Sequence, residues 1–449
     1  MAEAADYVEK NLDILLKELI ELCRIPGVSA WGTGLEEVAE VLTSRLAGLG
    51  AEVGVFRAKE DVPPILFGEL PGKSDKSLLF YNHYDVQPPD PLDEWDSDPF
   101  SPEIREGKVY GRGIEDNKGN LMARLQAVEA ILKTEGELPI TVKFVFEGNE
   151  EIGSPQFGEF SATHGEFLKA DACIWEAGGK DHIGRPNIYL GVKGLCYVEL
   201  RAYGARSDMH SSNATICPNP AWRLNWALST LKDRDERILV DGFYDDVRAP
   251  TDAELEALNA ISFPEKEAKE QWGISEMVLG LEGTALMKKH LLEPTCTICG
   301  LYSGYTDEGL KTVLPRQAMA KVDFRLVPDQ RPEVVADKLR VYLTKQGFGD
   351  IEVISVGGML PARTPLDSDF ARLLAETARE AYHREPVVYH NLVGSSPMYH
   401  VSETHGVPTA MVGIGYPGDN IHAPNENIRV QDYLEGMKYL ILIIERLGR

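Results

Sequence analysis

The chain carries few positive charges for its size, and this narrows the partners that it can have. Its 449 residues include 46 Lys and Arg against 71 Asp and Glu, which gives a formal net charge of −25. Such a surface keeps a protein soluble and repels the phosphate backbone of nucleic acids. We therefore expect no nucleic-acid partner.

The sequence also lacks a long hydrophobic run. Its longest apolar run extends from Tyr439 to Ile444, far too short to cross a bilayer. Residues 1–27 have acidic side chains where a signal peptide needs a basic segment and a continuous apolar one, and their pattern predicts an amphipathic helix. We expect a cytoplasmic protein with no membrane partner.

Cysteine is too scarce for a disulfide framework. The chain has six cysteines, most of them inside apolar segments. Cys296 and Cys299 form one C-x-x-C pair, but no second cysteine pair and no H-x₃₋₅-H follows to complete a zinc site. We interpret these two cysteines as small buried residues beside a strand.

What the sequence does contain is a regular alternation of strand-like and helix-like segments. The composition, 43% hydrophobic and 26% charged, is that of a globular protein with room for two or three domains. The alternation predicts an α/β fold with a mixed, mostly parallel sheet flanked by helices. Strands are predicted at 64–70, 77–84, 139–148 and 171–177, with helices at 34–50 and 120–133.

The pattern changes near Gly194 and returns after Pro361. Between them, hairpin-like strands and helices predict a smaller α+β domain, and after them a helix is predicted at 367–383 and another from Gln431. We therefore expect one catalytic domain, residues 1–193 and 361–449, interrupted by an inserted domain, residues 194–360.

Polar clusters follow several apolar segments in the same way. They contain His83 and Asp85, Asp116, Glu150 and Glu151, Glu176, and His422. Any one of them alone is also typical of a solvated loop. Because ligands collect at the carboxyl ends of strands in α/β sheets, the clusters together favour a shared site.

These side chains match the needs of two neighbouring divalent cations. Such a pair needs one bridging carboxylate, plus one nitrogen and one oxygen ligand for each cation. His83 with Glu176, His422 with Glu151, and Asp116 between them meet that need. Asp85 would then orient His83, while Glu150, pointing differently from its neighbour Glu151, stays free to accept a proton from water.

The motifs resemble those of the co-catalytic metallopeptidases that include carboxypeptidase G, aminoacylase and cytosolic dipeptidases. The matching strings are HYDVQP, GKVYGRGIEDNKG, FEGNEEIGS, FRLVP and IHAPNE, in an order that extends from about residue 10 to about residue 445. The strings HYDVQP and FRLVPDQRPE are most similar to the carnosine and non-specific dipeptidase branch. Glu176 departs from that branch, which often has aspartate there.

The resemblance implies a role for each matching residue. The implied metal ligands are His83, Asp116, Glu151, Glu176 and His422, with Asp116 bridging, Glu150 as general base and Asp85 supporting His83. His210 in DMHSS matches a histidine of a lid and dimerisation domain that reaches the partner's active site. Arg325 matches an arginine that binds the substrate's free carboxylate, and Ser396 falls in a substrate loop, although the dipeptidase pattern has an extra glycine there.

The expected reaction is hydrolysis of the amide bond next to a free C-terminal carboxylate in dipeptides or short peptides. The expected cofactors are two divalent cations, zinc first, with manganese and cobalt as alternatives. The role implied for His210 requires a partner subunit, so we expect a homodimer. Two alternatives stay open: a deacylase or desuccinylase of N-acyl amino acids, and a metal-binding relative without catalysis.

Overall fold

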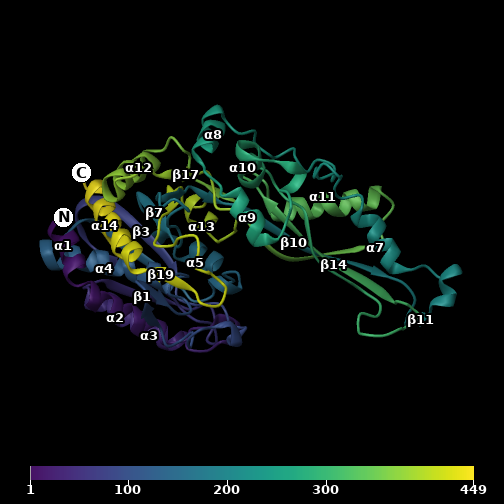
Figure 1. Ribbon diagram of the computed structural model, residues 1–449, viewed down its shortest axis with the longest axis horizontal. Coiled ribbons are helices and arrows are strands. Elements are labelled where there is room, and N and C mark those ends of the chain that lie inside the picture. Colours follow the sequence, from purple (N-terminus) through teal and green to yellow (C-terminus); the bar gives the residue numbers. More distant parts are fainter. Residues whose placement is uncertain (1) are drawn as a thin grey trace. The chain divides into compact units, whose positions relative to one another are not determined.

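The computed structural model describes residues 2–449, and the chain divides into two compact units. Unit 1 comprises the residues up to Gly191 together with Arg363–Asn391 and Pro397–Arg449, and unit 2 comprises Val192–Ala362 and Leu392–Ser396. The division expected from the sequence places residues 392–396 with the outer segments, whereas in the structure they group with unit 2. Figure 1 follows the chain through both units.

Unit 1 contains a mixed eight-stranded sheet with the order β1-β2-β6-β3-β7-β18-β8-β17. Strands β6, β3, β7 and β18 are parallel to one another, while β1, β2 and β6 pair antiparallel. This confirms the predicted α/β class. The strands are β1 Glu52–Phe56, β2 Ile65–Leu70, β3 Gly72–His83, β6 Leu138–Glu147, β7 Ala172–Trp175, β8 Asn187–Tyr189, β17 Val387–Tyr389 and β18 Thr409–Met411.

Helices cover this sheet on both faces. The long ones are α1 Ala2–Lys10, α2 Leu12–Cys23, α3 Leu35–Gly48, α4 Lys118–Glu135, α12 Asp369–Tyr382 and α14 Val430–Leu447. Figure 1 shows α14 beside α4, and both helices contact β3 and β6. Shorter elements are α5 Phe157–Thr163, α6 Gly165–Leu168, α13 Tyr399–Ser402, and the 3₁₀ turns η1 Ser29–Trp31, η2 Leu92–Glu94 and η3 Glu150–Ile152.

The expected N-terminal helix is interrupted at Asn11. The Asn11 side chain donates to the carbonyl of Tyr7 at 2.8 Å. A side-chain amide that binds nearby backbone competes with the helical hydrogen bonds, and this accounts for two helices where one was predicted.

Strand β3 is buried on both faces because successive side chains point to opposite sides of the sheet. Phe80 lies on the side of α4, where the guanidinium of Arg124 is 5.7 Å from its ring centre. Tyr81 points the other way, stacks on Trp175 at 3.6 Å between ring centres, and meets Phe157 of α5 edge-on. The continuous apolar run before His83 is therefore the sequence of a central strand.

Arg124 ties the carboxyl ends of the central strands together. Its side chain is buried on α4 and donates to the backbone carbonyls of Tyr81 and Glu176, which lie at the ends of β3 and β7. Burial lowers the pKa of Arg124 to about 9, and the nearby Cys173 and Glu176 oppose this shift only in part. The guanidinium of Arg124 therefore holds together the carboxyl ends of β3 and β7, where the predicted polar side chains lie.

Unit 2 contains a four-stranded antiparallel sheet with the order β12-β14-β10-β15. Helices α7 and α11 pack on it, so one face of β10 is buried and the other is partly exposed. The elements are β10 Gly194–Tyr203, α7 Pro220–Leu228, α8 Asp252–Ala257, η5 Leu258–Ala260, α9 Glu265–Trp272, η6 Val278–Gly280, α10 Gly283–Leu292, β12 Thr297–Ser303, β14 Gln317–Leu326, α11 Pro332–Lys345 and β15 Glu352–Met359.

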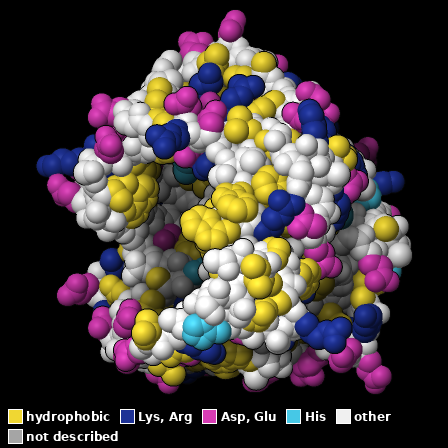
Figure 2. Space-filling model, turned by 90° about the vertical axis from the view of Figure 1, so that its right-hand side faces the viewer, with side chains coloured by type: hydrophobic (Ala, Val, Ile, Leu, Met, Phe, Trp, Pro, Cys, Tyr) yellow, Lys and Arg dark blue, Asp and Glu magenta, His cyan; other side chains and the backbone are white. Residues whose placement is uncertain are grey.

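Hydrophobic side chains are exposed on unit 2, among them the stacked Trp222 and Trp226 of α7. Figure 2 shows hydrophobic side chains gathered in patches between charged ones. One prediction here was wrong: Cys296 is buried, but Cys299 is exposed on β12, because this edge strand is largely uncovered. No helix within residues 2–449 is long and apolar enough to span a membrane.

Candidate metal centre

Three adjacent parallel strands deliver most of the predicted site. His83 is the last residue of β3, Glu150 and Glu151 follow β6 in η3, and Glu176 follows β7. Parallel pairing sets His83 opposite Glu147 at the end of β6, and β7 lies on the other side of β3. The carboxyl ends of these strands therefore place the four side chains at one edge of the sheet.

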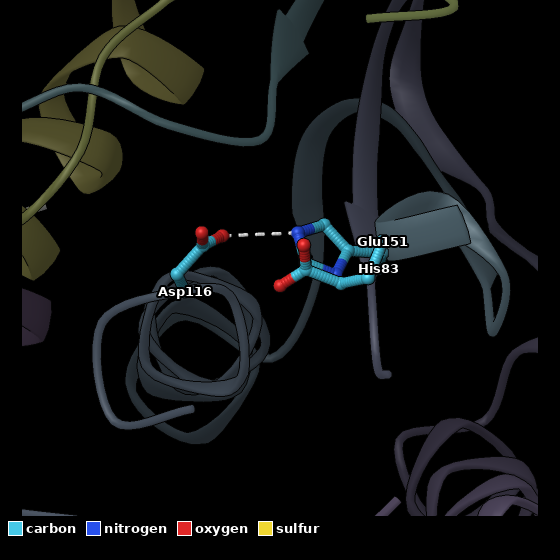
Figure 3. Close-up of side chains that lie close together, drawn as sticks. All are labelled: His83, Asp116 and Glu151. Atoms are coloured by element: carbon cyan, nitrogen blue, oxygen red, sulfur yellow. Dashed lines mark hydrogen bonds and ion pairs between the residues drawn. The ribbon is translucent and has the colours of Figure 1, made fainter. Parts of the chain in front are cut away.

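Loops bring the remaining two residues to the same edge. Asp116 lies just before α4, and Figure 3 shows it pointing toward His83 and Glu151. His422 lies between β18 and β19 Asn427–Arg429 in the left-handed region, with φ of 59°. Ligand atoms of His83, Asp116 and Glu151 all lie within 4.8 Å of one another.

Asp116 joins the two imidazoles. Its Oδ1 is 3.0 Å from Nε2 of His83, and its Oδ2 is 3.0 Å from Nε2 of His422. Nε2 of His422 is also 3.2 Å from Oε2 of Glu151, and Nε2 of His83 is 4.0 Å from Oε2 of Glu176. This is the arrangement of a bridging carboxylate, with a second carboxylate beside each imidazole.

The tautomer of His83 suits metal binding. Its Nδ1 lies 3.0 Å from the backbone carbonyl of Asp85, which can only accept a hydrogen bond, so Nδ1 carries the proton. Nε2 faces the carboxylates and is therefore the nitrogen that would bind a metal ion. The Asp85 side chain is 3.4 Å from Nδ1 and accepts from the backbone N–H groups of Glu150 and Glu151, each at 3.1 Å.

An observation independent of the spacing of these residues in the sequence also indicates that the donor set fits divalent cations. Oε1 of Glu151 and Oε2 of Glu176 are buried and have no hydrogen-bond partner among residues 2–449. Buried carboxylate oxygens are normally paired or bound to metal. Two imidazoles and three carboxylates, two of which have an oxygen without a partner, therefore form a candidate site for cations that accept nitrogen and oxygen ligands.

The electrostatics of the site follow from crowding acids and imidazoles together. Burial and then the neighbouring Glu176 hold the pKa of Glu150 well above its usual range. Burial opposes ionisation of Asp116, but hydrogen bonds from His422 and His83 outweigh it and lower the pKa of Asp116. Hydrogen bonds with Asp116 and Glu151 raise the pKa of His422 to about 10, and burial raises that of Glu176 to about 7.

Three residues that support the centre were missed by sequence reasoning. Gln87 Nε2 donates to Oε2 of Glu151 at 2.8 Å, and Trp175 Nε1 donates to Oε1 of Glu176 at 3.0 Å. The Glu426 carboxylate is buried and accepts from the backbone N–H of Asp116 at 3.0 Å. Gln87 and Glu426 lie inside the HYDVQP and IHAPNE motifs, and this was the only available signal for them.

The other three predicted site residues belong to unit 2, and their participation stays a prediction. Nδ1 of the exposed His210 accepts from the backbone N–H of Ser212 at 3.2 Å, which leaves the proton of a neutral ring on Nε2. Arg325 Nη1 donates to the hydroxyl of Ser395 at 2.9 Å. Ser396 is buried, and its hydroxyl has no hydrogen-bond partner within residues 2–449.

Comparison with known proteins gives one family match and several similar proteins. A profile of the peptidase family M20/M25/M40 matches residues 79–446. The Cys-Gly metallodipeptidase of Schizosaccharomyces pombe is 30% identical over 361 residues, covering 76% of this chain and 75% of that protein. The Beta-Ala-His dipeptidase of Homo sapiens is 30% identical over 397 residues, covering 84% and 76%.

A solved structure is similar over nearly its full length. It is an M20 family metallo-carboxypeptidase from Sulfolobus solfataricus, 39% identical, with a TM-score of 0.90 and coverage of 97% of this chain and 99% of that one. The similarity therefore includes both units described above.

Proposed function

The chain belongs to the peptidase family M20/M25/M40, and on that premise we propose that it is a metal-dependent hydrolase of dipeptides and short peptides. Membership confirms the resemblance seen in the motifs. The observation that carries the proposal is Asp116, whose two carboxylate oxygens each lie 3.0 Å from a different imidazole. A structural ion pair needs one acid and one base. Here one carboxylate lies between two histidines, and each histidine has a further acid beside it.

The residues that would hold the cations are the five predicted ligands. His83 and Glu176 would bind one cation, His422 and Glu151 the other, and Asp116 both. When bound, two divalent cations supply Lewis-acid activation of water and of the scissile carbonyl. Zinc is the first candidate because imidazole suits it, while the carboxylates also suit manganese or cobalt.

Glu150 is the proposed general base. It has no place in the ligand set, and burial together with the neighbouring Glu176 raises its pKa above the usual value of a glutamate, the direction that favours proton uptake. Its carboxylate takes a proton from the attacking water and returns it to the leaving amine nitrogen. Asp85 positions it by accepting the Glu150 backbone N–H.

His210 and Arg325 are proposed to bind the substrate. The proton on Nε2 of His210 can be donated to the oxyanion that forms at the scissile carbonyl, because Nδ1 is occupied by the Ser212 N–H. Arg325 presents a planar fork of donors suited to the free C-terminal carboxylate. Ser396 is proposed to line the same region, next to Ser395, which already binds Arg325.

We also propose that the protein is a homodimer and cytoplasmic. The exposed hydrophobic side chains of unit 2, including Trp222 and Trp226, support association, because such patches often mark interfaces. All six cysteines are free, which fits a reducing compartment.

Removing and restoring the metal in the presence of matched substrates tests the proposal. Protein stripped by a chelator should lose hydrolysis of dipeptides, and one of zinc, manganese or cobalt should restore it. N-acyl amino acids with the same C-terminal residue test the deacylase alternative. The similarity to dipeptidases and a carboxypeptidase does not favour this alternative. Faster cleavage of the acyl substrates than of the dipeptides would contradict the proposal.

A further inference from the structure

Unit 2 contains a cavity of about 300 Å³ that is lined only by its own residues. This volume corresponds to about ten water molecules, enough for one amino-acid side chain. The lining comes from the start of β10, the loop after α7, helix α10, the start of β12 and the end of β14.

Cations dominate the polar lining of this cavity. Lys193, Lys232, Lys289 and Arg325 contribute to it, against a single acidic residue, Glu236. Three of the cations have acidic neighbours: Lys232 pairs with Glu236 at 2.6 Å, Lys289 with Glu293 at 3.3 Å, and Arg325 with Asp323 at 3.3 Å. In a chain of net charge −25, such a concentration of positive charge is unusual.

Lys193 is the exception among these four. Its residue is only 3% exposed, yet no carboxylate pairs with its ammonium in the part of the chain that the structure describes. Nζ donates instead to the backbone carbonyls of His290 and Glu293, each at 2.7 Å, at the end of α10. An ammonium has three donors, so one remains for a ligand.

The energetic state of Lys193 agrees with a missing anion. Burial lowers the pKa of Lys193 to about 8; the charge of Glu293 opposes this shift only in part, and the charges of Arg325 and Lys289 add to it. Buried charges are normally paired, and a bound carboxylate would supply the absent partner.

We propose that this cavity is the subsite for an acidic side chain on the C-terminal residue of the substrate, with Lys193 Nζ donating to its carboxylate. Val278, Leu286 and Pro294 line the same cavity and offer apolar contact to the methylene groups of such a side chain. The proposal rests on the proposed function, because Arg325, the expected partner of the α-carboxylate, lines the same cavity. If Arg325 binds the α-carboxylate of the substrate's C-terminal residue, the side chain of that residue would lie in this cavity.

Two dipeptides that differ only in charge test the preference. For the metal-loaded protein, kcat/KM for alanyl-glutamate should exceed that for alanyl-glutamine roughly 10- to 100-fold, the factor that a hydrogen bond to a charged group supplies. Alanyl-aspartate and alanyl-asparagine provide a second pair with a shorter side chain. A ratio near one for both pairs overturns the proposal, while hydrolysis of the neutral dipeptides leaves the proposed function intact.

Variants of the cavity residues test whether Lys193 is responsible for the preference for an acidic side chain. Lys193→Met should reduce the ratio to within about threefold of one, because it removes the donor while keeping a similar volume. Lys232→Gln, at a partly exposed position, should reduce it less and serves if Lys193→Met fails to fold. Lys321→Met, an exposed lysine on β14 outside the cavity, is the control and should leave the ratio unchanged. An unchanged ratio in folded Lys193→Met overturns the proposal.

A binding measurement separates the two hypotheses. Calorimetry of the full chain should show tighter binding of L-glutamate than of L-glutamine, and Lys193→Met should abolish the difference. Selective glutamate binding without hydrolysis of any dipeptide would uphold the cavity and overturn the proposed function. Equal binding of the two amino acids, with normal hydrolysis of alanyl-glutamine, would do the reverse.

Discussion

At the scale of the residue, Glu150 is the side chain whose role can be isolated most cleanly. Glu150→Gln keeps the size of the side chain but removes its ability to take up a proton. We expect turnover to fall about 10²- to 10⁴-fold, the usual contribution of a general base, with bound metal unchanged. Steady-state kinetics and metal analysis on the same sample check both parts.

A matched control for this change is Glu166→Gln. Glu166 is an exposed acid of α6 in the same unit, so its substitution should leave turnover and metal content as they are. Loss of metal from Glu150→Gln would reassign Glu150 to the ligand set, and undiminished turnover would exclude it as the base.

The histidines of the centre predict a pH dependence for metal binding. In protein stripped of metal, hydrogen bonds with Asp116 and Glu151 raise the pKa of His422 to about 10, so its ring is protonated at neutral pH. A metal ion needs the unprotonated nitrogen, so binding must release a proton and affinity must rise as pH increases toward 10. Each proton released makes the affinity rise up to about tenfold per pH unit.

Calorimetry of zinc binding in two buffers with different ionisation enthalpies counts the released protons. His422→Gln should release fewer protons than the unmodified chain, whereas His182→Gln, an exposed histidine elsewhere in unit 1, should release as many. Affinity that stays constant between pH 7 and pH 9, values chosen below the raised pKa, would contradict this account.

The residues that meet at the candidate metal centre could be predicted from the sequence, but the residues that support them could not. His83, Glu151 and Glu176 are chemically distinctive residues that end or follow predicted strands, so strand prediction places them at one edge of the sheet, whereas Asp116 and His422 lie in loops. Gln87 and Trp175 act only through contacts that form when distant segments meet, such as the 2.8 Å bond from Gln87 to Glu151. A glutamine or tryptophan in a motif carries no sign of such a partner.

At the scale of the element, the loop before α4 depends on one acid 310 residues away in sequence. The Glu426 carboxylate accepts from the backbone N–H groups of Gly113, Glu115 and Asp116 at 2.9 to 3.0 Å, and from Arg112 at 2.8 Å. A carboxylate offers only acceptors to this ring of donors, so it fixes the loop and the direction of Asp116.

Glu426→Gln should therefore weaken the centre without touching a ligand. The amide places donors against donors, which should lower the free energy of unfolding by about 1–3 kcal/mol. Misplacement of Asp116 should weaken zinc affinity about 10- to 100-fold, as loss of a residue supporting a metal ligand generally does. Urea unfolding and a competitive zinc titration measure the two effects.

The control for Glu426→Gln is Glu385→Gln, whose side chain is 72% exposed and pairs only with Arg379 among the ion pairs of residues 2–449. It should change stability by no more than about 0.5 kcal/mol and leave zinc affinity unaltered. If Glu426→Gln left both quantities at their original values, the loop would be held by other contacts.

Most long elements were predictable from the sequence, and so were some of the short ones. The helix predicted at 120–133 is α4 and the strand predicted at 139–148 is β6, because both have long, regular patterns. Strand β17 falls within the apolar segment 385–390, from which a strand is expected, whereas β8 has only three residues, too few for a pattern, and pairs in parallel with β17. The break at Asn11 depends on one local hydrogen bond, which hydrophobic periodicity does not reveal.

At the scale of the whole molecule, the sequence indicates an insertion because its pattern changes twice, near Gly194 and Pro361. The grouping of Leu392–Ser396 with unit 2 could not be seen in this way. Those residues join unit 2 through contacts such as the bond from Arg325 to Ser395 and that from the Lys193 N–H to the carbonyl of Leu392. Such contacts link segments separated by more than 60 residues.

The proposed dimer makes a prediction that neither unit makes alone, because His210 lies in unit 2 and Glu150 in unit 1. If His210 of one subunit serves the metal centre of the other, Glu150→Gln and His210→Ala should each be nearly inactive but should complement when mixed. In a mixed dimer, one site combines an intact Glu150 with an intact His210 from the partner. With random subunit exchange, about a quarter of the original activity should return. Action within one subunit would return none, so activity after mixing and dilution through subunit exchange decides between the two arrangements.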